Sequence, residues 1–302
     1  MFTKFEEIFA ELQNRGARKR MIAAWGVDSH TIAAAGKAVD LGLVDVTLVG
    51  DENMIAEVCE KENIDKSIFT IVHNPNELKS IAQAVEMVNN GEADILMKGL
   101  CSTDKYMRGI LNKEKGLLPP KAVLSHVCLM ENPNYHKMLV FSDIAVIPAP
   151  DFKQKQAMIG YVANVAKAIG VEKPKVALIT ATEQMLPGMP ACVEAAMLAK
   201  MSDRGQIGGC VVDGPLALDV ALSEEAVKIK KLSSPVAGDA DCLVFPAIEA
   251  ANVFYKTNTQ LLPGVRVAAM VAGAKAPCVL SSRADSIDTK LNSIALAAVT
   301  AK

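Results

Sequence analysis

The chain has 302 residues, 51% of them hydrophobic, with 32 lysines and arginines against 34 aspartates and glutamates. This length and apolar content are enough for one large domain, or two of ordinary size, with a buried core. The nearly balanced charge argues against binding to nucleic acid or to an anionic membrane, so small molecules are the expected partners.

Short apolar runs alternate with longer segments of helical periodicity, which indicates an α/β fold of strands joined by crossover helices. The expected strands are 20–26, 46–50, 68–73, 93–99, 122–129, 137–143, 175–180, 241–247 and 276–282. The expected helices are 4–15, 29–41, 52–62, 76–90, 154–169, 190–201, 249–261 and 286–301. Two prolines within 145–156 interrupt regular structure and predict a domain seam. We expect one α/β domain from 1–146 plus 274–302 and a second from 147–273.

No uninterrupted apolar segment opens the chain, and no stretch approaches the ~18 apolar residues of a membrane helix, so we expect neither signal peptide nor membrane span. The seven cysteines lie singly in apolar surroundings, without Cys-x-x-Cys pairs or metal-ligand spacing to the four histidines. They are interpreted as buried thiols of a protein in the reducing cytoplasm, and no metal site is expected.

A first polar cluster follows strand 93–99, at the end of the strand where wound α/β sheets bind ligands. Lys98 and Gly99 end the strand. Ser102, Thr103 and Arg108 follow on the turn and the next helix. Cations, hydroxyls and a permissive glycine favour an anion site. The alternative is an ordinary strand-to-helix turn capped by a hydroxyl, with solvated cations.

Two further polar stretches follow apolar runs. Asp143 is placed either to orient an arginine or bind a substrate hydroxyl, or to cap a turn. Asp213, Gly214 and Pro215 are interpreted as a turn before a helix, since Asp-Gly-Pro is common turn chemistry.

The segment 279–299 carries the fourth cluster. Ser282 and Arg283 follow the strand, and Asp285 lies just before the last helix, where it is a candidate N-cap with Asp288 at position N3. A cation beside a helix N-terminus is electrostatically unfavourable unless an anion joins it. Arg283 therefore favours a bound phosphate.

Two other stretches carry weaker signals. Glu183 follows strand 175–180, next to a methionine-rich loop that suits an apolar acyl group or simple packing. Glu249 and Asn252 lie one helical turn apart at a helix start, where they either bind substrate or cap the helix.

The sequence contains no P-loop, no Gly-x-Gly-x-x-Gly turn after a strand and no Gly-x-Ser-x-Gly elbow, which argues against an ATPase or an ordinary Rossmann dehydrogenase.

Several motifs occur in one order between residues 93 and 300: MKG..STD..MR, FSD.AV.P.P, DGPLALD.A.S, LVFP..EA.N..YK and SRADS...K.NSIALA. In these motifs the chain resembles the phosphate acetyltransferase and phosphate butyryltransferase family. The segments SSRADS, EQMLPGMPA and DGPLALDVALS make it more similar to the butyryl branch.

The resemblance implies two three-layer αβα domains of the isocitrate/isopropylmalate dehydrogenase type, with the active site in an interdomain cleft. It implies reversible transfer of a short acyl group, butyryl or similar, between coenzyme A and inorganic phosphate. Coenzyme A is then a substrate, and no prosthetic group or metal is needed. A cytoplasmic homodimer or larger homo-oligomer is expected. The alternatives are a phosphate acyltransferase acting on acyl carrier protein and a non-catalytic acyl-CoA binding protein.

Carried over by residue, Ser282 and Arg283 match the family's Ser-Arg pair, and Arg108 matches a phosphate-contacting arginine. Lys98 and Thr103 lie in the matching loop and complete the expected phosphate site. The further candidate substrate-binding residues are Gly99, Ser102, Asp143, Glu183, Glu249 and Asn252.

The thiol of coenzyme A needs a proton acceptor, and we expect Asp285 or, failing that, Asp288 to serve. The sequence departs here from the acetyltransferase pattern. Thr289 stands where that branch has a catalytic aspartate, and Gln260 stands where a further arginine is expected.

Overall fold

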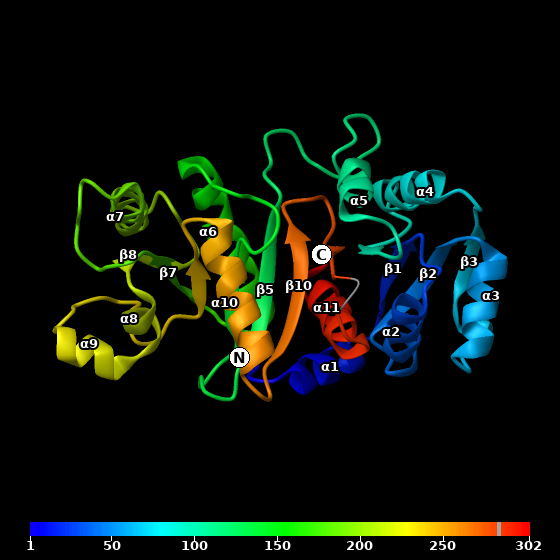
Figure 1. Cartoon of the computed structure of the whole chain (residues 1–302), viewed down its shortest axis with the longest axis horizontal. Coiled ribbons are helices and arrows are strands. Elements are labelled where there is room, and N and C mark those ends of the chain that lie inside the picture. Colours follow the sequence, from blue (N-terminus) through cyan, green and yellow to red (C-terminus); the bar gives the residue numbers. More distant parts are fainter. Residues whose placement is uncertain (283–284) are drawn as a thin grey trace. The chain divides into compact units, whose positions relative to one another are not determined.

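The computed structural model describes residues 1–282 and 285–302, which fold as alternating strands and helices (Figure 1). The expected α/β class is confirmed. The chain divides into two compact units. We call residues 5–124 with 267–302 the N-terminal unit, and residues 1–4 with 125–266 the central unit. Arg283 and Ala284 lie outside the described residues.

The N-terminal unit is built on a mostly parallel sheet in the order β3-β2-β1-β4-β11-β10. Its strands are β1 (Lys19–Ala24), β2 (Val44–Gly50), β3 (Thr70–His73), β4 (Ile95–Lys98), β11 (Cys278–Val279) and β10 (Arg266–Ala272), whose first residue belongs to the central unit. Only the β10–β11 pair is antiparallel among these. The register sets Ala24 beside Lys98 and Val279 beside Met97. The carboxyl ends of β1, β4 and β11 therefore meet at one edge.

Helices cover both faces of this sheet. They are α1 (Phe5–Asn14), α2 (Ser29–Asp40), α3 (Glu52–Lys61), the short 3₁₀ helix η1 (Lys66–Ile68), α4 (Glu77–Asn89), α5 (Thr103–Ile110) and α11 (Ile287–Thr300). The last helix, α11, packs on α2 and α1, while α4 packs on α5 (Figure 1). Every residue of α11 from Lys290 to Val299 is buried, so this helix lies inside the core rather than on its surface.

The central unit holds a second set of strands in the order β5-β6-β9-β7-β8. They are β5 (Ser125–Glu131), β6 (Leu139–Ser142), β7 (Lys175–Ile179), β8 (Val211–Leu216) and β9 (Cys242–Val244). Its helices are α6 (Phe152–Ala168), α7 (Pro190–Asp203), α8 (Leu218–Leu222), α9 (Glu224–Lys230) and α10 (Ile248–Leu261). Strands β6, β9, β7 and β8 run parallel, and α6 packs along the middle of them.

The division between the units falls at 124/125 and 266/267, whereas the sequence analysis placed it at 146/147 and 273/274. The predicted and observed boundaries differ because of how the strands pair. Strand β6 hydrogen-bonds in parallel with β9, so Val140 lies beside Cys242 from much later in the chain. This long-range pairing groups β5 and β6 with the central unit, and sequence proximity alone does not reveal it.

The interpretation of Asp213-Gly-Pro as a turn is wrong, because these residues lie inside β8. The Gly214–Pro215 peptide is cis, and β8 pairs only with β7, at an edge of the sheet where a proline costs no ladder hydrogen bond. A Cβ on Gly214 would lie 2.7 Å from that of Leu178, so close strand packing explains this glycine. The sequence analysis also missed β10 and α9.

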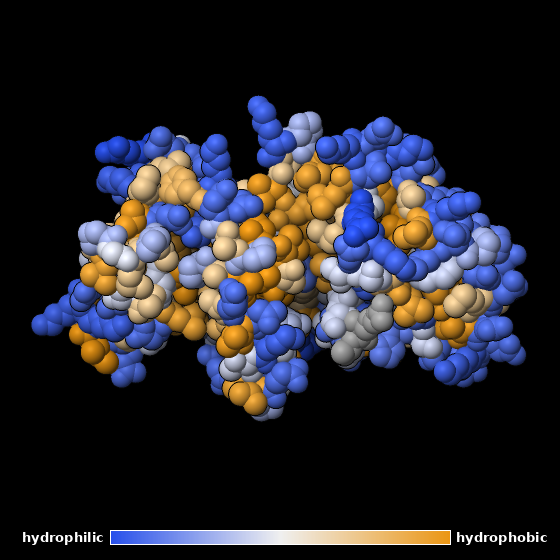
Figure 2. Space-filling view, turned by 45° about the horizontal axis from the view of Figure 1, so that its top comes forward, coloured by the Kyte–Doolittle hydropathy of each residue, from blue (hydrophilic) through white to orange (hydrophobic). Residues whose placement is uncertain are grey.

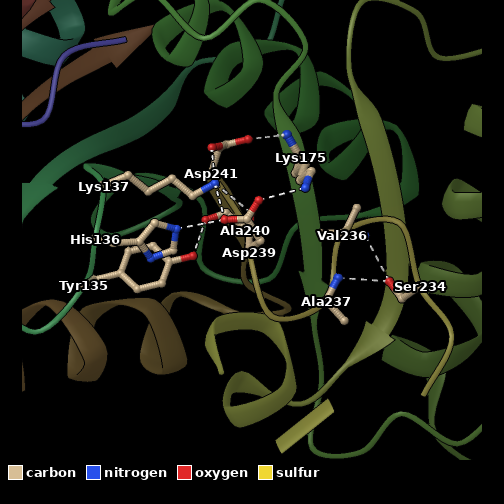
Figure 3. A network of polar contacts seen from close by, with 10 residues as sticks. All are labelled: Tyr135, His136, Lys137, Lys175, Ser234, Val236, Ala237, Asp239, Ala240 and Asp241. Carbon is tan, nitrogen blue, oxygen red and sulfur yellow. Dashed lines mark hydrogen bonds and ion pairs between the residues drawn. The ribbon is translucent and has the colours of Figure 1, made fainter. Parts of the chain in front are cut away.

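A network of polar contacts lies where β6, β7 and β9 of the central unit begin (Figure 3). The Lys137 ammonium is 6% exposed and contacts Asp241 at 2.7 Å and Asp239 at 2.8 Å. Asp239 also pairs with Lys175 at 2.7 Å and with His136 at 2.8 Å. The network joins three strand starts, at the end opposite to the one where parallel sheets bind ligands.

The seven cysteines are all buried and reduced, as expected. Figure 2 shows mainly hydrophilic side chains over the region of α3 and α4, with single apolar residues among them. Within the described residues, no helix is long and apolar enough to cross a membrane.

Candidate active site

The carboxyl end of β4 carries Lys98 and Gly99, as the sequence predicted. The Lys98 side chain is only 4% exposed, and its Nζ donates to the Gly99 carbonyl at 3.3 Å. Gly99 donates its N–H to the Ala24 carbonyl at 3.0 Å, and a Cβ here would lie 2.1 Å from the carbonyl oxygen of Trp25. Only glycine fits this approach of two backbones, so Gly99 fixes where the Lys98 ammonium lies.

Three residues that follow β4, in the turn and in α5, have defined local contacts. Ser102 is the N-cap of α5, and its hydroxyl accepts the Lys105 N–H at 3.3 Å, so the cap of the alternative is present, whereas Lys98 is buried and not solvated. Thr103 is exposed and opens the helix. The Arg108 guanidinium pairs with Asp104 at 3.1 Å, and its side chain is 78% exposed. The expected phosphate contacts of Thr103 and Arg108 remain predictions.

The segment between β11 and α11 begins at the same edge. Ser286, rather than Asp285, is the N-cap of α11: its hydroxyl accepts the Thr289 N–H at 3.1 Å. The expectation of Asp285 as the N-cap is wrong, because its carboxylate instead accepts the Ser282 N–H at 2.7 Å, and its role as proton acceptor stays a prediction. Asp285 therefore holds the backbone of Ser282 in place. Arg283, the expected phosphate ligand, lies outside the described residues.

The other candidate proton acceptor, Asp288, lies on the first turn of α11. Its side chain is 76% exposed and pairs with the Lys37 ammonium at 3.2 Å. Because the N-cap is Ser286, Asp288 occupies position N2 rather than the expected N3, which is Thr289. Asp288 is thus a solvated residue that links α11 to α2.

The structure adds Lys290, which the sequence analysis missed. Its side chain is 4% exposed, and its Nζ donates to Ser281 Oγ at 2.9 Å and to the Ser282 carbonyl at 3.0 Å. The signal was present in the helical periodicity: Lys290 lies four and seven residues before Ile294 and Ala297, both fully buried. A lysine on the apolar face of a core helix is unusual enough to mark a site.

Charged groups from three elements surround the Lys290 ammonium. Burial lowers the pKa of Lys290 below that of an ordinary lysine. The carboxylates of Asp285 and Asp28 oppose this shift, and the charge of Lys98 adds to it. The segments that carry these groups are far apart in the sequence and meet only because β1, β4 and β11 are neighbours.

Asp28 follows β1 and caps α2, where its Oδ1 accepts the Thr31 N–H at 3.0 Å. Its second oxygen, Oδ2, is buried and has no hydrogen-bond partner among the described residues. Buried carboxylate oxygens normally accept hydrogen bonds, so this atom is an available acceptor on a carboxylate that interacts electrostatically with Lys290. The sequence analysis did not select Asp28.

In the central unit, the structure favours the turn-capping alternative for Asp143. The side chain is 1% exposed. One carboxylate oxygen accepts from the Ser125 hydroxyl and the His126 N–H, both at 2.9 Å. The other accepts the N–H groups of Ala145 and Val146 at 2.8 and 2.7 Å. Four protein donors thus occupy the carboxylate and order the chain after β6.

The remaining candidates of the central unit show different degrees of engagement. Asn252 donates to the Ile144 carbonyl at 3.0 Å and so supports the turn that Asp143 caps. Glu249 is exposed in the first turn of α10. Glu183 pairs with Lys230 at 3.3 Å. Their expected substrate contacts remain predictions.

The described residues include no group of three or more histidines, cysteines, aspartates or glutamates that could hold a metal ion. Cations and hydroxyls instead gather at the carboxyl ends of β4 and β11. This fold and this donor set define an α/β protein suited to anionic small molecules.

Comparison with known proteins agrees with that class. The family model described as "Phosphate acetyl/butaryl transferase" matches residues 65–298. Phosphate butyryltransferase of Clostridium acetobutylicum is 44% identical over 301 residues, covering 100% of this chain and 99% of that protein. Phosphate acetyltransferase of Thermotoga maritima is 42% identical over 285 residues, covering 94% and 96%. A branched-chain phosphotransacylase from Enterococcus faecalis V583 aligns with a TM-score of 0.82 and 31% identity, covering 93% and 98%.

The chain therefore belongs to the phosphate acetyl/butyryl transferase family. The resemblance noted from the motifs is confirmed, and so is the expectation that the chain is a phosphate acyltransferase.

Proposed function

We propose that the chain transfers a butyryl-sized acyl group reversibly between coenzyme A and inorganic phosphate. One observation carries this proposal. In a chain of this family, the buried Lys98 and the Ser281–Ser282 segment lie together at the carboxyl ends of the neighbouring strands β4 and β11. A cation and hydroxyls fixed at such an edge are suited to an acyl phosphate.

The phosphate site is proposed to form around Lys98. Its ammonium is a compact charge held by the backbone contact of Gly99, which suits it to a phosphoryl oxygen. Arg283, which lies outside the described residues, is proposed as the bidentate ligand of the same phosphate. Arg108 and Thr103 on α5 are proposed to reach the phosphate from its solvent side.

Ser282 is proposed to stabilise the oxyanion of the tetrahedral intermediate. Its N–H is bound by Asp285 and its carbonyl by Lys290, so the backbone of this exposed residue is fixed from two sides. A hydroxyl donor that needs no reorganisation during the reaction lowers the barrier most effectively. Asp285 contributes by holding Ser282 in place.

The substrate contacts of the central unit are proposed on a narrower basis. Asp143 and Asn252 order the turn after β6, and their proposed effect on substrate is through that turn. Glu183 and Glu249 offer partly exposed or exposed carboxylates as proposed substrate contacts. Gly99 and Ser102 shape the loop of the phosphate site. The seven buried thiols suit a cytoplasmic enzyme, and a homodimer or larger homo-oligomer is proposed for its assembly.

The test is a direct assay. Purified protein is mixed with butyryl-CoA and phosphate, and the release of free coenzyme A thiol is followed with a thiol reagent. We expect turnover that requires phosphate, and a loss of about 10²-fold or more in kcat for Ser282→Ala. Exchanging butyryl-CoA for butyryl acyl carrier protein addresses the first alternative. Binding of butyryl-CoA without thiol release, over several short acyl chains, would favour a binding protein.

A further inference from the structure

The reaction moves one proton, and both aspartates chosen from the sequence as its acceptor make other contacts. Asp285 already accepts the Ser282 N–H, and Asp288 is 76% exposed and paired with Lys37. An ordinary carboxylate is also a poor partner for a thiol, because their pKa values near 4 and 8.5 differ by about 4.5 units, which disfavours the transfer by more than about 10⁴-fold.

Resting on the function proposed above, we propose that Lys290 shuttles this proton between the thiol of coenzyme A and the phosphate. The amine lies at the edge of the sheet where the carboxyl ends of β4 and β11 meet, bound to the carbonyl of Ser282 and the hydroxyl of Ser281. It is thus one hydrogen bond away from the residue proposed to hold the reacting carbonyl.

The hydrogen bonds of Lys290 fit the neutral amine. A neutral lysine has two N–H donors and one lone pair. Its two partners among the described residues, Ser281 Oγ at 2.9 Å and the Ser282 carbonyl at 3.0 Å, are both acceptors and use both donors. The lone pair is then left to accept a proton from a substrate.

The surroundings of Lys290 favour a base of moderate strength. Burial lowers its pKa, and the positive charge of Lys98 on β4 adds to the shift. Asp285, before α11, and Asp28, before α2, oppose the shift and keep the protonated form accessible. A lysine whose pKa is lowered by burial is partly available as the neutral amine, which accepts a proton from a thiol and can return it.

The proton balance of the reaction supports one group that acts twice. Lys290 takes the thiol proton, and the thiolate forms the C–S bond at the carbonyl carbon of the acyl phosphate. The bond between the carbonyl carbon and the bridging oxygen then breaks, and the phosphate leaves with the electron pair on that oxygen. The ammonium of Lys290 returns the proton to that phosphate, which is released as the hydrogen phosphate dianion. In reverse, Lys290 takes the proton from hydrogen phosphate and gives it to the departing thiolate.

The deciding variant is Lys290→Arg, assayed with butyryl phosphate and coenzyme A. Arginine keeps the positive charge and the donors, but it does not lose its proton in this pH range. We expect kcat/KM for coenzyme A to fall about 10²–10⁴-fold near pH 7.5, the usual contribution of a general base. The loss should shrink about tenfold per pH unit up to the thiol pKa near 8.5, as the thiol ionises unaided. Lys115→Arg, on an exposed lysine paired with Glu86, serves as the matched control and should match the wild type.

Two further measurements keep the proposal testable if Lys290→Arg does not fold. In Lys290→Ala, added methylamine should restore part of the thiol release. In Lys98→Met, the acid limb of the wild-type pH profile should move to higher pH, because the neighbouring cation no longer favours the neutral amine. Wild-type turnover with unchanged activity in Lys290→Arg, or with no shift in Lys98→Met, would overturn the shuttle. A loss confined to Asp285→Asn would assign the proton to that aspartate. Absence of turnover in the wild type would instead refute the proposed function.

Discussion

Replacing Lys137 with methionine should destabilise the central unit strongly. Lys137 is 6% exposed and bridges Asp239 and Asp241 (Figure 3). Asp239 is 35% exposed and keeps Lys175 and His136, so it loses little. Asp241 is 6% exposed and keeps the Lys175 N–H at 2.8 Å. Stranding this buried carboxylate should cost about 3–5 kcal/mol of unfolding free energy, the usual result of removing one partner of a buried pair.

The assay must report on the central unit. The single tryptophan, Trp25, lies in the N-terminal unit, so its fluorescence is the wrong probe. Hydrogen exchange of the β6 and β9 amides in urea reports locally. With a slope of about 2 kcal/mol per molar urea, the predicted loss moves the midpoint down by about 2 M.

A double variant and a control separate the buried pair from general damage. Lys137→Met combined with Asp241→Asn removes the stranded charge and should recover part of the loss. Lys200→Met breaks an exposed pair with Asp203 on α7 and should change stability by less than about 1 kcal/mol. If Lys137→Met shifts the midpoint no more than Lys200→Met does, the buried bridge is not a stabilising element and the reasoning fails.

Three further outcomes are expected. Burial alone would raise the pKa of Asp239, but hydrogen bonds from Lys137, Lys175 and His136 hold that pKa well below its usual range. The central unit should therefore lose stability as pH falls below about 5. Urea titrations at several pH values should show this loss, and Asp239→Asn should reduce it. Gly99→Ala places a Cβ 2.1 Å from the Trp25 carbonyl oxygen, so it should lower the thermal midpoint and cut turnover. Gly91→Ala is the comparison: its Cβ meets open space, so this variant tests only the strain of a φ of 79°. Arg108→Ala should leave the melting temperature unchanged, since its pair with Asp104 is exposed, but should raise the KM for phosphate; an unchanged KM would remove Arg108 from the phosphate site.

Local patterns were sufficient to predict most elements of the fold. Strands such as β2 and β7 contain short apolar runs, and α6 was expected at 154–169, although its true start at Phe152 follows the Asp151 cap and its capping box with Gln154. The prediction failed where one sequence motif fits two kinds of structure. Asp213-Gly-Pro is good turn chemistry, yet it lies in β8 because an edge strand tolerates proline. The strand β10 was missed although Pro263-Gly264 marks a turn between α10 and the start of this strand.

The candidate site was predicted in part for a similar reason. Lys98 and Ser282 were found because each follows an apolar run, which is a local signal. The N-cap of α11 was predicted at Asp285 but lies one residue later, at Ser286. Both side chains are good caps, and only the tertiary contact of Asp285 with the Ser282 N–H distinguishes them.

Lys290 and Asp28 show what local reasoning misses. Each is a charged residue beside a helix start, and only the burial periodicity of α11 marks Lys290 along the chain. They become neighbours because the sheet order sets β1 next to β4 and β4 next to β11, which brings the segments after these strands to one edge. The low exposure of Lys290 then follows from the burial of α11, whose residues from Lys290 to Val299 all lie in the core. The same packing that stabilises this helix shields its lysine from water, and that shielding is what makes the lysine a usable base. Fold stability and proton transfer thus depend on one feature, so a substitution that solvates α11 near Lys290 should weaken both together.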